Sequence, residues 1–358
     1  MLGGKHMGAR ARVAILAAPT LAVAVTVTVT ACGSSSSSSS AGGATEAATG
    51  LQQQYENAVT TVLPSVVQIF TSDATGSGVV YDSKGDIITN AHVVGDESTV
   101  KVVPATGGDT LTAKVLGKFP AGDLAVIRVE SDATKLKAAT FGNSDDVKAG
   151  QIVLAMGNPL GLTGSVSQGI VSALGRTVSA TSSADRSSSA TTITDAIQTT
   201  AAINGGNSGG ALVNLEDQVV GIPTAAARDP EAGAAPGIGF AIPSNTATSI
   251  ARQLIDTGRV TSSGRASLNI TATTVATRQG EEAGVGLITA TAGGAAANAG
   301  LQAGDVIVDL GGQPTMNVGT LNALLATLKP GQQVQVKYLR SGSATVNTVT
   351  VTLGELSS

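Results

Sequence analysis

The stretch Asn204-Gly205-Gly206-Asn207-Ser208-Gly209-Gly210 is the most informative part of this sequence. A serine in such a glycine-rich stretch can simply belong to a tight turn. The same setting also suits a nucleophile, because glycines let backbone N–H groups converge on one point while the hydroxyl projects into a cleft. Serine is a weak nucleophile until a base removes its proton, so the second interpretation requires a histidine elsewhere in the chain.

The sequence contains two histidines, His6 and His92, and His92 lies in the segment Ile87-Ile88-Thr89-Asn90-Ala91-His92-Val93-Val94. A single histidine beside an apolar strand is more often a packed core residue than a base. A catalytic imidazole also needs a carboxylate that fixes its tautomer. Asp123 precedes the apolar segment 124–129, although an acid at that place is also common at the start of an ordinary strand.

Several segments of the chain resemble the HtrA/Deg group of trypsin-like proteases. They are residues 89–94 around His92, residues 123–126 beginning with Asp123, residues 206–212 around Ser208, and residues 156–159, 169–173 and 237–243. The resemblance covers about residues 60–355. It implies an all-β, chymotrypsin-like fold of two six-stranded β-barrels with the site between them.

The resemblance also implies a role for each residue of the site. Ser208 attacks the peptide carbonyl, His92 takes and returns the proton, and Asp123 orients His92. The backbone N–H groups of Gly206 and Ser208 form the oxyanion hole. No metal ion and no organic cofactor is expected.

A substrate pocket for the residue before the cut is implied by the same resemblance, and its lining is Ile203, Ile222, Pro223 and Thr224. These side chains are apolar or small and none is acidic. We therefore expect cleavage after small aliphatic residues such as Val or Ala, and not after Lys or Arg. The alternative for Ile203 is ordinary packing inside the barrel.

The predicted protease domain, residues 55–258, consists of short segments rich in Val, Ile and Thr that recur about every ten residues and are typical of an all-β fold. We predict strands at 66–71, 78–81, 86–90, 99–103, 111–116, 124–129, 152–156, 169–174, 219–224 and 238–242. A helix is predicted over Thr246–Thr257, with Gly258 after it. Residues 177–192, rich in Ser, Thr and Ala, predict a long surface loop.

A second domain is predicted at residues 265–356, with strands at 286–290, 305–310, 333–339 and 345–352. A helix is predicted over Thr320–Leu328 because its leucines repeat at helical spacing. Residues 295–307 and this helix resemble the α+β PDZ domain that follows the protease in the same family. Such domains bind C-terminal or extended peptides by strand addition, and the carboxylate loop is implied at Ser267, Leu268, Asn269 and Ile270.

Three positions depart from the family pattern. Asn269 stands where the family usually has glycine, and asparagine adopts left-handed backbone less readily than glycine. Beside the serine, the chain has Thr200 and Gly205 where the family commonly has aspartate and proline. Glycine in place of proline raises the entropy cost of ordering the loop. We therefore expect a poorly preformed oxyanion hole and low basal activity until a ligand or assembly orders it.

The N-terminal segment has the pattern of a secretory signal. Residues 1–12 carry three cations and no acid, and residues 13–31 are mostly apolar. Val29-Thr30-Ala31-Cys32 resembles a bacterial lipobox, which implies cleavage after residue 31 and lipidation of Cys32. A plain secreted signal and an uncleaved anchor remain alternatives. Residues 32–54 are predicted to be a Ser/Gly-rich flexible tether, with the protein held at the outer face of the bacterial cell membrane.

Charge and composition narrow the function further. The chain has 21 Lys and Arg against 25 Asp and Glu, which excludes a strongly basic nucleic-acid binder. One cysteine excludes a disulfide scaffold and a cysteine-based zinc site. The resemblance to the HtrA/Deg group, together with the N-terminal signal pattern, implies an extracytoplasmic serine endopeptidase that degrades misfolded or damaged envelope proteins and is regulated by its PDZ domain.

Two other functions stay open at this point. A chaperone or peptide-binding module would hold unfolded chains and cut them rarely or never. An adhesin or cell-wall structural protein fits the Ser, Thr, Gly and Ala content but leaves the three catalytic candidates without a role. Family precedent further predicts a homotrimer built through the segment around Tyr55 and Phe70.

Overall fold

The structure is a computed structural model that describes residues 41–131, 133–158, 164–180, 191–204, 206–229, 233–277, 279–343 and 345–358. The predicted signal segment and Cys32 lie outside the described residues, as do Gly205 and residues 181–190 of the predicted surface loop. Within the described ranges, no helix is both long and apolar enough to cross a membrane.

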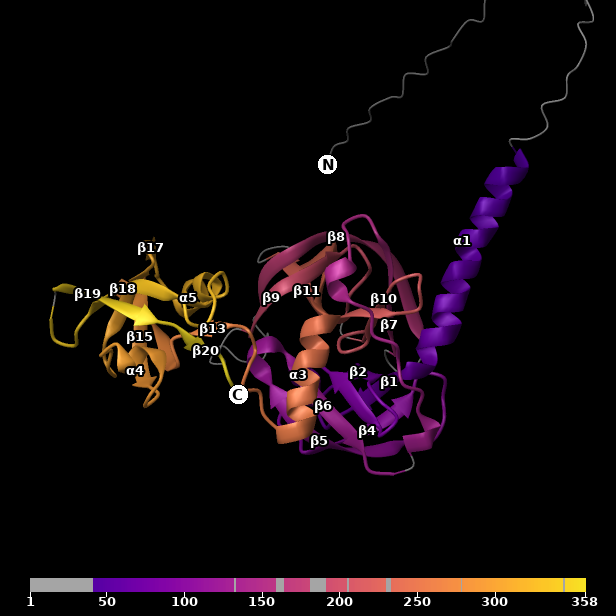
Figure 1. The fold of residues 1–358 in the computed structure, drawn as a ribbon, viewed down its shortest axis with the longest axis horizontal. Helices are drawn as coiled ribbons and strands as arrows, with labels where there is room; N and C mark the ends of the chain where they lie inside the picture. Colours follow the sequence, from indigo (N-terminus) through magenta and orange to yellow (C-terminus); the bar gives the residue numbers. More distant parts are fainter. Residues whose placement is uncertain are drawn as a thin grey trace, which may run out of the picture. The chain divides into compact units, whose positions relative to one another are not determined.

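The first described element is the helix α1, Ala41–Val62 (Figure 1). The prediction of a flexible tether as far as residue 54 is therefore wrong from residue 41 onward. The serine run ends at residue 40, and the following residues include Ala, Glu and Gln, which favour helix. Side-chain pairs one turn apart add to this, because Gln52 donates to Glu56 at 2.7 Å. The helix ends in the core, where Ala58 and Val62 are buried.

The first barrel follows the short helix η1 (Leu63–Ser65) and closes in the order β1-β2-β3-β6-β5-β4. Its strands are β1 (Val66–Phe70), β2 (Thr75–Val80), β3 (Asp86–Thr89), β4 (Thr99–Pro104), β5 (Leu111–Phe119) and β6 (Leu124–Val129). β3 and β6 pair antiparallel, with Thr89 opposite Ala125. The end of β3 and the start of β6 therefore lie at the same edge of the barrel. The short helices α2 (Ala91–Val94) and η2 (Pro120–Gly122) adjoin these strands at that edge.

The second barrel closes in the order β10-β11-β12-β9-β8-β7. Its strands are β7 (Ile152–Gly157), β8 (Ser165–Ala180), β9 (Thr191–Thr199), β10 (Ala211–Val213), β11 (Val219–Asp229) and β12 (Gly233–Pro243). β8 and β9 occupy both ends of the predicted loop at 177–192, so the prediction of a loop is wrong at 177–180 and at 191–192. Two short helices, η3 (Ala133–Lys135) and η4 (Ser144–Asp146), lie between the barrels in sequence.

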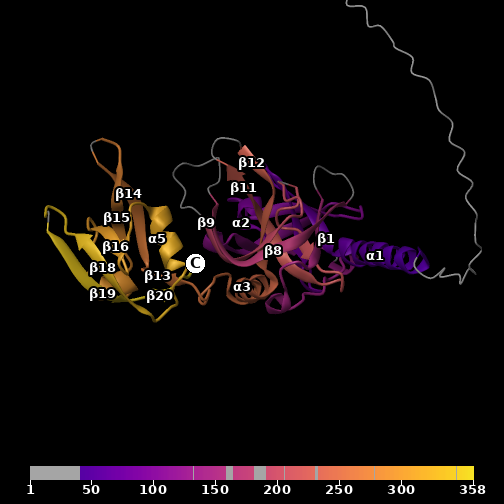
Figure 2. The ribbon, with the colours of Figure 1, turned by 90° about the horizontal axis from the view of Figure 1, so that it is seen from above.

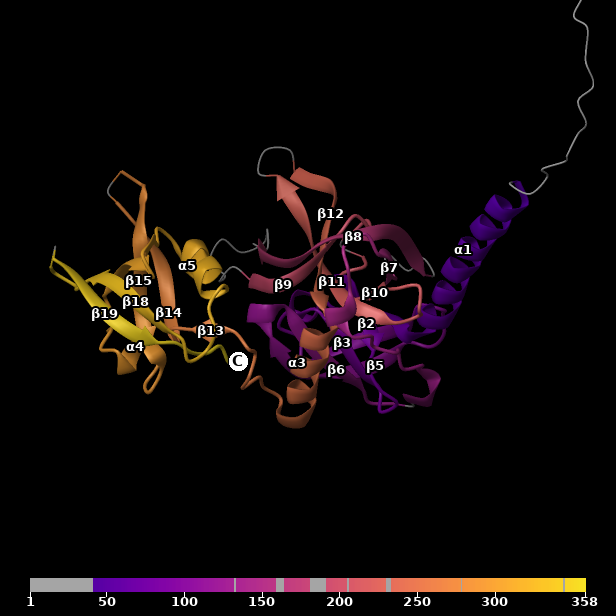
Figure 3. The same cartoon turned by 45° about the horizontal axis from the view of Figure 1, so that its top comes forward.

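The helix α3 (Ser244–Thr257) follows the second barrel and packs on β5, β6 and β11 (Figure 3). It ends at Gly258, whose φ of 73° is left-handed. A shared core joins the two barrels, since Ile88 of β3, Met156 of β7 and Ile222 of β11 belong to one buried cluster. The expected double barrel is confirmed.

The C-terminal domain has a core of its own. A sheet in the order β14-β15-β16-β18-β19 is accompanied by the pair β13-β20, while β17 pairs with β16. The elements are β13 (Ala266–Ser267), β14 (Ile270–Ala276), β15 (Glu282–Ala290), α4 (Ala295–Asn298), β16 (Val306–Leu310), β17 (Gln313–Pro314), α5 (Val318–Leu325), β18 (Gln333–Leu339), β19 (Val346–Thr352) and β20 (Gly354–Glu355). The helix α5 lies beside β14 (Figure 2), as expected for an α+β PDZ domain.

Candidate active site

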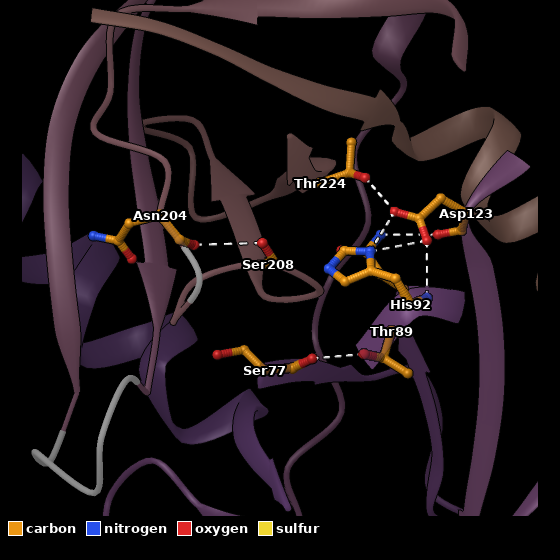
Figure 4. Close-up of polar contacts among 8 residues, drawn as sticks. Ser77, Thr89, His92, Asp123, Asn204, Ser208 and Thr224 are labelled. Carbon is orange, nitrogen blue, oxygen red and sulfur yellow. Dashed lines mark hydrogen bonds and ion pairs between the residues drawn. The ribbon is translucent and has the colours of Figure 1, made fainter. Parts of the chain in front are cut away.

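His92 and Asp123 meet at the edge of the first barrel where β3 ends and β6 begins. His92 Nδ1 lies 2.8 Å from Asp123 Oδ2 and 3.0 Å from Oδ1 (Figure 4). The backbone N–H of His92 also donates to Oδ1, at 3.0 Å. A carboxylate on Nδ1 fixes the tautomer with its hydrogen on Nδ1, so Nε2 keeps the lone pair that a general base needs.

The backbone of Asp123 is held in an unusual conformation. Its φ of 52° is left-handed, which is unfavourable for any residue other than glycine. Asn90 Nδ2 donates to the Asp123 carbonyl at 2.9 Å, and Thr224 Oγ1 donates to Asp123 Oδ2. Both contacts are buried, so the neighbours fix the carboxylate in place. Backbone strain held by its surroundings in this way is common at functional sites.

The pKa of His92 is shifted by two opposing effects. Partial burial lowers the pKa of the imidazole, while its hydrogen bond to the Asp123 carboxylate and the negative charge of that carboxylate raise it. The net effect is a pKa above the usual 6.5. Asp123 therefore favours the imidazolium that would form when His92 accepts a proton. Among the described residues, no three His, Cys, Asp or Glu side chains gather into a set that could hold a metal ion.

The segment that carries Ser208, here called the Ser208 loop (residues 204 and 206–210), lies next to this pair. Its polar groups form hydrogen bonds with one another. Ser208 Oγ donates to the carbonyl of Asn204 at 3.4 Å (Figure 4). The N–H of Gly206 donates to Asn204 Oδ1 at 3.1 Å. Asn207 closes the loop, since its Oδ1 accepts from the N–H of Asn204 at 2.9 Å. The described residues thus bring His92, Asp123 and Ser208 together without a hydrogen bond between Ser208 Oγ and His92.

The glycines after Ser208 serve close packing between the barrels. Gly209 has a φ of 81°, and a Cβ there would lie 2.3 Å from Ser77 O and 2.5 Å from Thr89 Oγ1. A Cβ on Gly210 would lie 2.2 Å from Met156 O. Both positions therefore require glycine on steric grounds, and not because they supply oxyanion donors.

The predicted substrate pocket is only partly present. Ile222 is fully buried in the shared core, so its assignment to the pocket is wrong. Side chains of a strand alternate between faces, so consecutive residues of β11 do not all face one pocket. Thr224 turns to Asp123, and Pro223 is buried with its carbonyl accepting from Gly209 at 2.8 Å. Ile203 is half-buried and packs closely on Gly239.

The predicted carboxylate loop precedes β14 in the C-terminal domain. Asn269 adopts a φ of 55°, the left-handed conformation for which the family residue is glycine. Its Nδ2 donates to Glu355 O at 3.0 Å and its Oδ1 accepts from the N–H of Ala295 at 3.2 Å. Its own N–H donates to Ser267 Oγ at 2.9 Å, and Leu268 is buried in the domain core. The asparagine therefore ties the loop to β20 and α4.

The comparisons with known proteins agree with this architecture. Family models described as Trypsin-like peptidase domain and PDZ domain match residues 76–222 and 269–353. A crystal structure of the serine endoprotease from Yersinia pestis is 34% identical and has a TM-score of 0.54, and the match covers 84% of this chain and 98% of that one. The chain belongs to the HtrA/Deg family. The HtrA-type protease AlgW, solved with a decapeptide, is 29% identical with a TM-score of 0.54, and the match covers 84% of this chain and 98% of AlgW.

Curated relatives of this HtrA/Deg chain include longer proteins. Serine protease PepD of Mycobacterium tuberculosis is 38% identical over 318 residues, which are 84% of this chain and 66% of PepD. Periplasmic serine endoprotease DegP of Escherichia coli is 39% identical over 276 residues, which are 75% of this chain and 55% of DegP. The chain therefore spans between about half and two thirds of these relatives. The resemblance inferred from the sequence is confirmed at the level of family and fold.

Proposed function

We propose that this chain is a serine endopeptidase that acts outside the cytoplasm on misfolded or damaged envelope proteins. The observation that carries the proposal is the imidazole of His92, held on Nδ1 by both oxygens of Asp123 beside the Ser208 loop. The names of DegP relatives, which describe periplasmic serine endoproteases, support the location.

In the proposed mechanism, Ser208 Oγ attacks the peptide carbonyl while His92 Nε2 accepts its proton. The carbonyl oxygen becomes an oxyanion that the N–H groups of Gly206 and Ser208 stabilise, and each such donor contributes about 10²–10³ in rate. His92 then gives the proton to the leaving amine, and water releases the acyl group by the same steps. Asp123 stabilises the imidazolium.

The loop must rearrange before this chemistry starts. Ser208 Oγ leaves the Asn204 carbonyl for His92, and the N–H of Gly206 leaves Asn204 Oδ1 for the oxyanion. These two contacts support low basal activity that rises when a bound ligand or assembly reorders the loop. Regulation through peptide binding at the PDZ domain is part of the same proposal, with β14 and α5 as the binding elements.

Cleavage after small aliphatic residues is proposed from the apolar neighbours of the loop. Ile203 is half-buried, and Ile238, next to the Gly239 that Ile203 contacts, is 38% exposed. A peptide library should be cut after Val or Ala in preference to Lys, and Ile203→Asp should move the preference towards Lys and Arg. Equal cleavage after Lys and Val in the unaltered protein would contradict this specificity.

Attachment of a lipid at Cys32 and assembly into a trimer remain proposals. Both rest on the sequence and on family precedent. The intact mass of the protein recovered from a bacterial host would show the lipid and the cleavage after residue 31. Sedimentation of the same sample would give its oligomeric state.

The decisive experiment compares the unaltered protein with Ser208→Ala. Casein digestion and covalent labelling by a serine-reactive phosphonate are expected from the first and lost in the second. The alternative, a chaperone or peptide-binding module, predicts that neither protein digests casein while both suppress aggregation of an unfolded protein. Labelling should increase when unfolded substrate is present, because the substrate orders the loop.

A further inference from the structure

Ser77 lies in β2 of the first barrel and contacts the Ser208 loop of the second. It is fully buried. Its Oγ donates to the carbonyl of Gly206 at 2.7 Å and accepts from the N–H of Asn158 at 2.9 Å. Its backbone N–H donates to the carbonyl of Ser208 at 2.9 Å. One residue of the first barrel is therefore bonded to both residues that supply the proposed oxyanion donors.

The same residue is also bonded to the strand that leads to His92. Thr89, at the end of β3, donates through Oγ1 to the carbonyl of Ser77 at 2.7 Å (Figure 4). Glycines flank Ser77, and a Cβ on Gly76 or Gly78 would lie 2.6 Å from Val93 or Ile87 side-chain atoms. The strand is thus packed tightly, and Ser77 links the backbone near His92 with the backbone near Ser208.

The direction of the Ser77 hydroxyl is determined by its two partners. A hydroxyl has one hydrogen to donate, and here the Asn158 N–H occupies an acceptor site of the oxygen, so the hydrogen points to Gly206 O. Gly206 has no side chain, and its backbone has wide conformational freedom. The bond on its carbonyl therefore restricts the peptide plane between Gly206 and Asn207. It limits the positions from which the N–H of Gly206, which lies in the preceding peptide, can approach a ligand.

We propose that Ser77 is a positioning residue for the proteolytic reaction. Its hydroxyl holds the carbonyl of Gly206 and its backbone N–H holds the carbonyl of Ser208. The backbone on both sides of Asn207 therefore stays anchored to the first barrel, near His92, while the N–H of Gly206 and the hydroxyl of Ser208 turn away from Asn204. This inference rests on the proposed function. It adds a residue that lies in none of the motifs on which that function depends.

The test is Ser77→Ala, with Ser244→Ala as the matched control. Ser244 is also fully buried, and its Oγ donates to the carbonyl of Gly142 at 2.7 Å at the start of α3. Each variant loses one buried serine-to-backbone hydrogen bond. With a fluorogenic peptide, we expect kcat of Ser77→Ala to fall about 10- to 100-fold with KM nearly unchanged. Ser244→Ala should keep the kcat of the unaltered protein.

A second measurement separates positioning from loss of stability. The affinity for a peptidyl boronate, which forms a tetrahedral adduct with the serine, should fall in parallel with kcat in Ser77→Ala. The affinity for an uncleaved peptide of the same sequence should not change. Ser77→Cys, which restores a weak donor, should recover part of the lost kcat.

Two outcomes would overturn the role of Ser77. One is a kcat for Ser77→Ala within about twofold of the unaltered protein, and the other is an equal loss in Ser244→Ala. If the unaltered protein shows no Ser208-dependent cleavage, the proposed function fails instead. Amide hydrogen exchange then tests whether Ser77 positions the loop. Faster exchange at residues 206–210 in Ser77→Ala, but not in Ser244→Ala, supports the positioning role, and unchanged exchange in Ser77→Ala refutes it.

Discussion

The backbone N–H of Gly206 donates to the side-chain Oδ1 of Asn204 at 3.1 Å. In the proposed mechanism this N–H donates to the oxyanion. In the structure it is instead engaged by a side chain of the same loop. The carbonyl of Asn204 also accepts the Ser208 hydroxyl at 3.4 Å, longer than the usual 2.5–3.0 Å of such bonds. Asn204 therefore competes with substrate for both groups, through one ordinary and one long bond.

Removal of the Asn204 side chain should raise basal activity. Asn204→Ala frees the N–H of Gly206, and a net hydrogen bond of about 0.5–1.5 kcal/mol corresponds to a gain of roughly 2- to 12-fold in kcat/KM. Asn204→Asp should lower activity, because a carboxylate holds the N–H more strongly and repels the oxyanion. Hydrolysis of a short peptide without activator measures both. A lower rate in both variants would show that Asn204 supports the active loop instead.

Loss of the Thr224 hydroxyl should impair catalysis through Asp123. Thr224→Val keeps the shape of the side chain and removes the bond to Asp123 Oδ2. Hydrogen bonds to charged groups contribute about 1.5–3 kcal/mol, so we expect kcat to fall by about 10- to 100-fold. The comparison is Thr248→Val in α3, where a buried hydroxyl bonds a backbone carbonyl at 2.9 Å. Equal activity of the two variants would contradict a role of Thr224 in holding Asp123.

The sequence predicts those residues of the candidate site that lie in short segments with a recognisable pattern. Ser208, His92 and Asp123 each lie in a short segment with its own pattern, and the order of the segments indicated the family. The antiparallel pairing of β3 and β6 then places His92 and Asp123 together. Ser77 carries no such signal, and the sequence assigns Thr224 to the pocket without indicating its bond to Asp123. The hydrogen-bond partners of these two residues are 129 and 101 residues away in the chain. Only the packing of one barrel on the other shows what they contact.

Strands are also predicted well only where the local sequence pattern, and not long-range pairing, decides their conformation. Apolar segments bounded by turn residues were placed well, and the prediction for 124–129 coincides with β6. The sequence does not predict β9 (Thr191–Thr199), because its Thr-rich start resembles a loop and its pairing with β8 and β12 decides its conformation. The three-residue β10 is too short for a periodic pattern. The assignment of Ile222 to the pocket fails because side chains alternate along β11 and that of Ile222 faces the shared core.

Breaking the ion pair of Asp86 and Arg128 should destabilise the first barrel. The two side chains form paired hydrogen bonds of 2.6 and 2.7 Å, with Asp86 fully buried. Arg128→Met would leave the carboxylate buried without its cation. We expect a loss of roughly 3 kcal/mol, the lower end for buried pairs because the Arg128 side chain is 37% exposed. Urea unfolding of the unaltered protein and of Arg128→Met measures this loss in the free energy of unfolding.

The control for this ion pair is Lys135→Met. Lys135 pairs with Asp109, whose side chain is 76% exposed, and water solvates both charges. Its urea midpoint should stay close to that of the unaltered protein. Equal midpoints for Arg128→Met and Lys135→Met would show that the buried pair adds no more than a surface pair.

Replacement of Asn269 by glycine should destabilise the C-terminal domain less than replacement by alanine. Both substitutions lose the side-chain bonds to Glu355 and Ala295. Glycine adopts the φ of 55° freely, whereas alanine adds about 1 kcal/mol or more of left-handed strain. Hydrogen exchange across residues 266–356 should therefore be faster in Asn269→Ala than in Asn269→Gly. The reverse order would show that the loop relaxes out of the left-handed conformation.

The pH dependence should follow the raised pKa of His92. The base must be neutral, so kcat/KM falls as the pH drops through this pKa. Stability changes in the opposite sense, because a raised pKa means that the contribution of the protonated pair is present at low pH and is lost as the pH rises through the folded value. Profiles between about pH 5 and pH 8 cover the transition.

Asp123→Asn tests the cause of this shift. The variant removes both effects that raise the pKa of His92 and leaves partial burial, which lowers it. The acidic limb of the profile should therefore move to lower pH, while the plateau falls by about 10⁴ because the amide disrupts the tautomer. NMR titration of the His92 ring, assigned with His92→Gln, measures the same pKa without turnover. Identical titration in both proteins would mean that Asp123 does not set the basicity of His92.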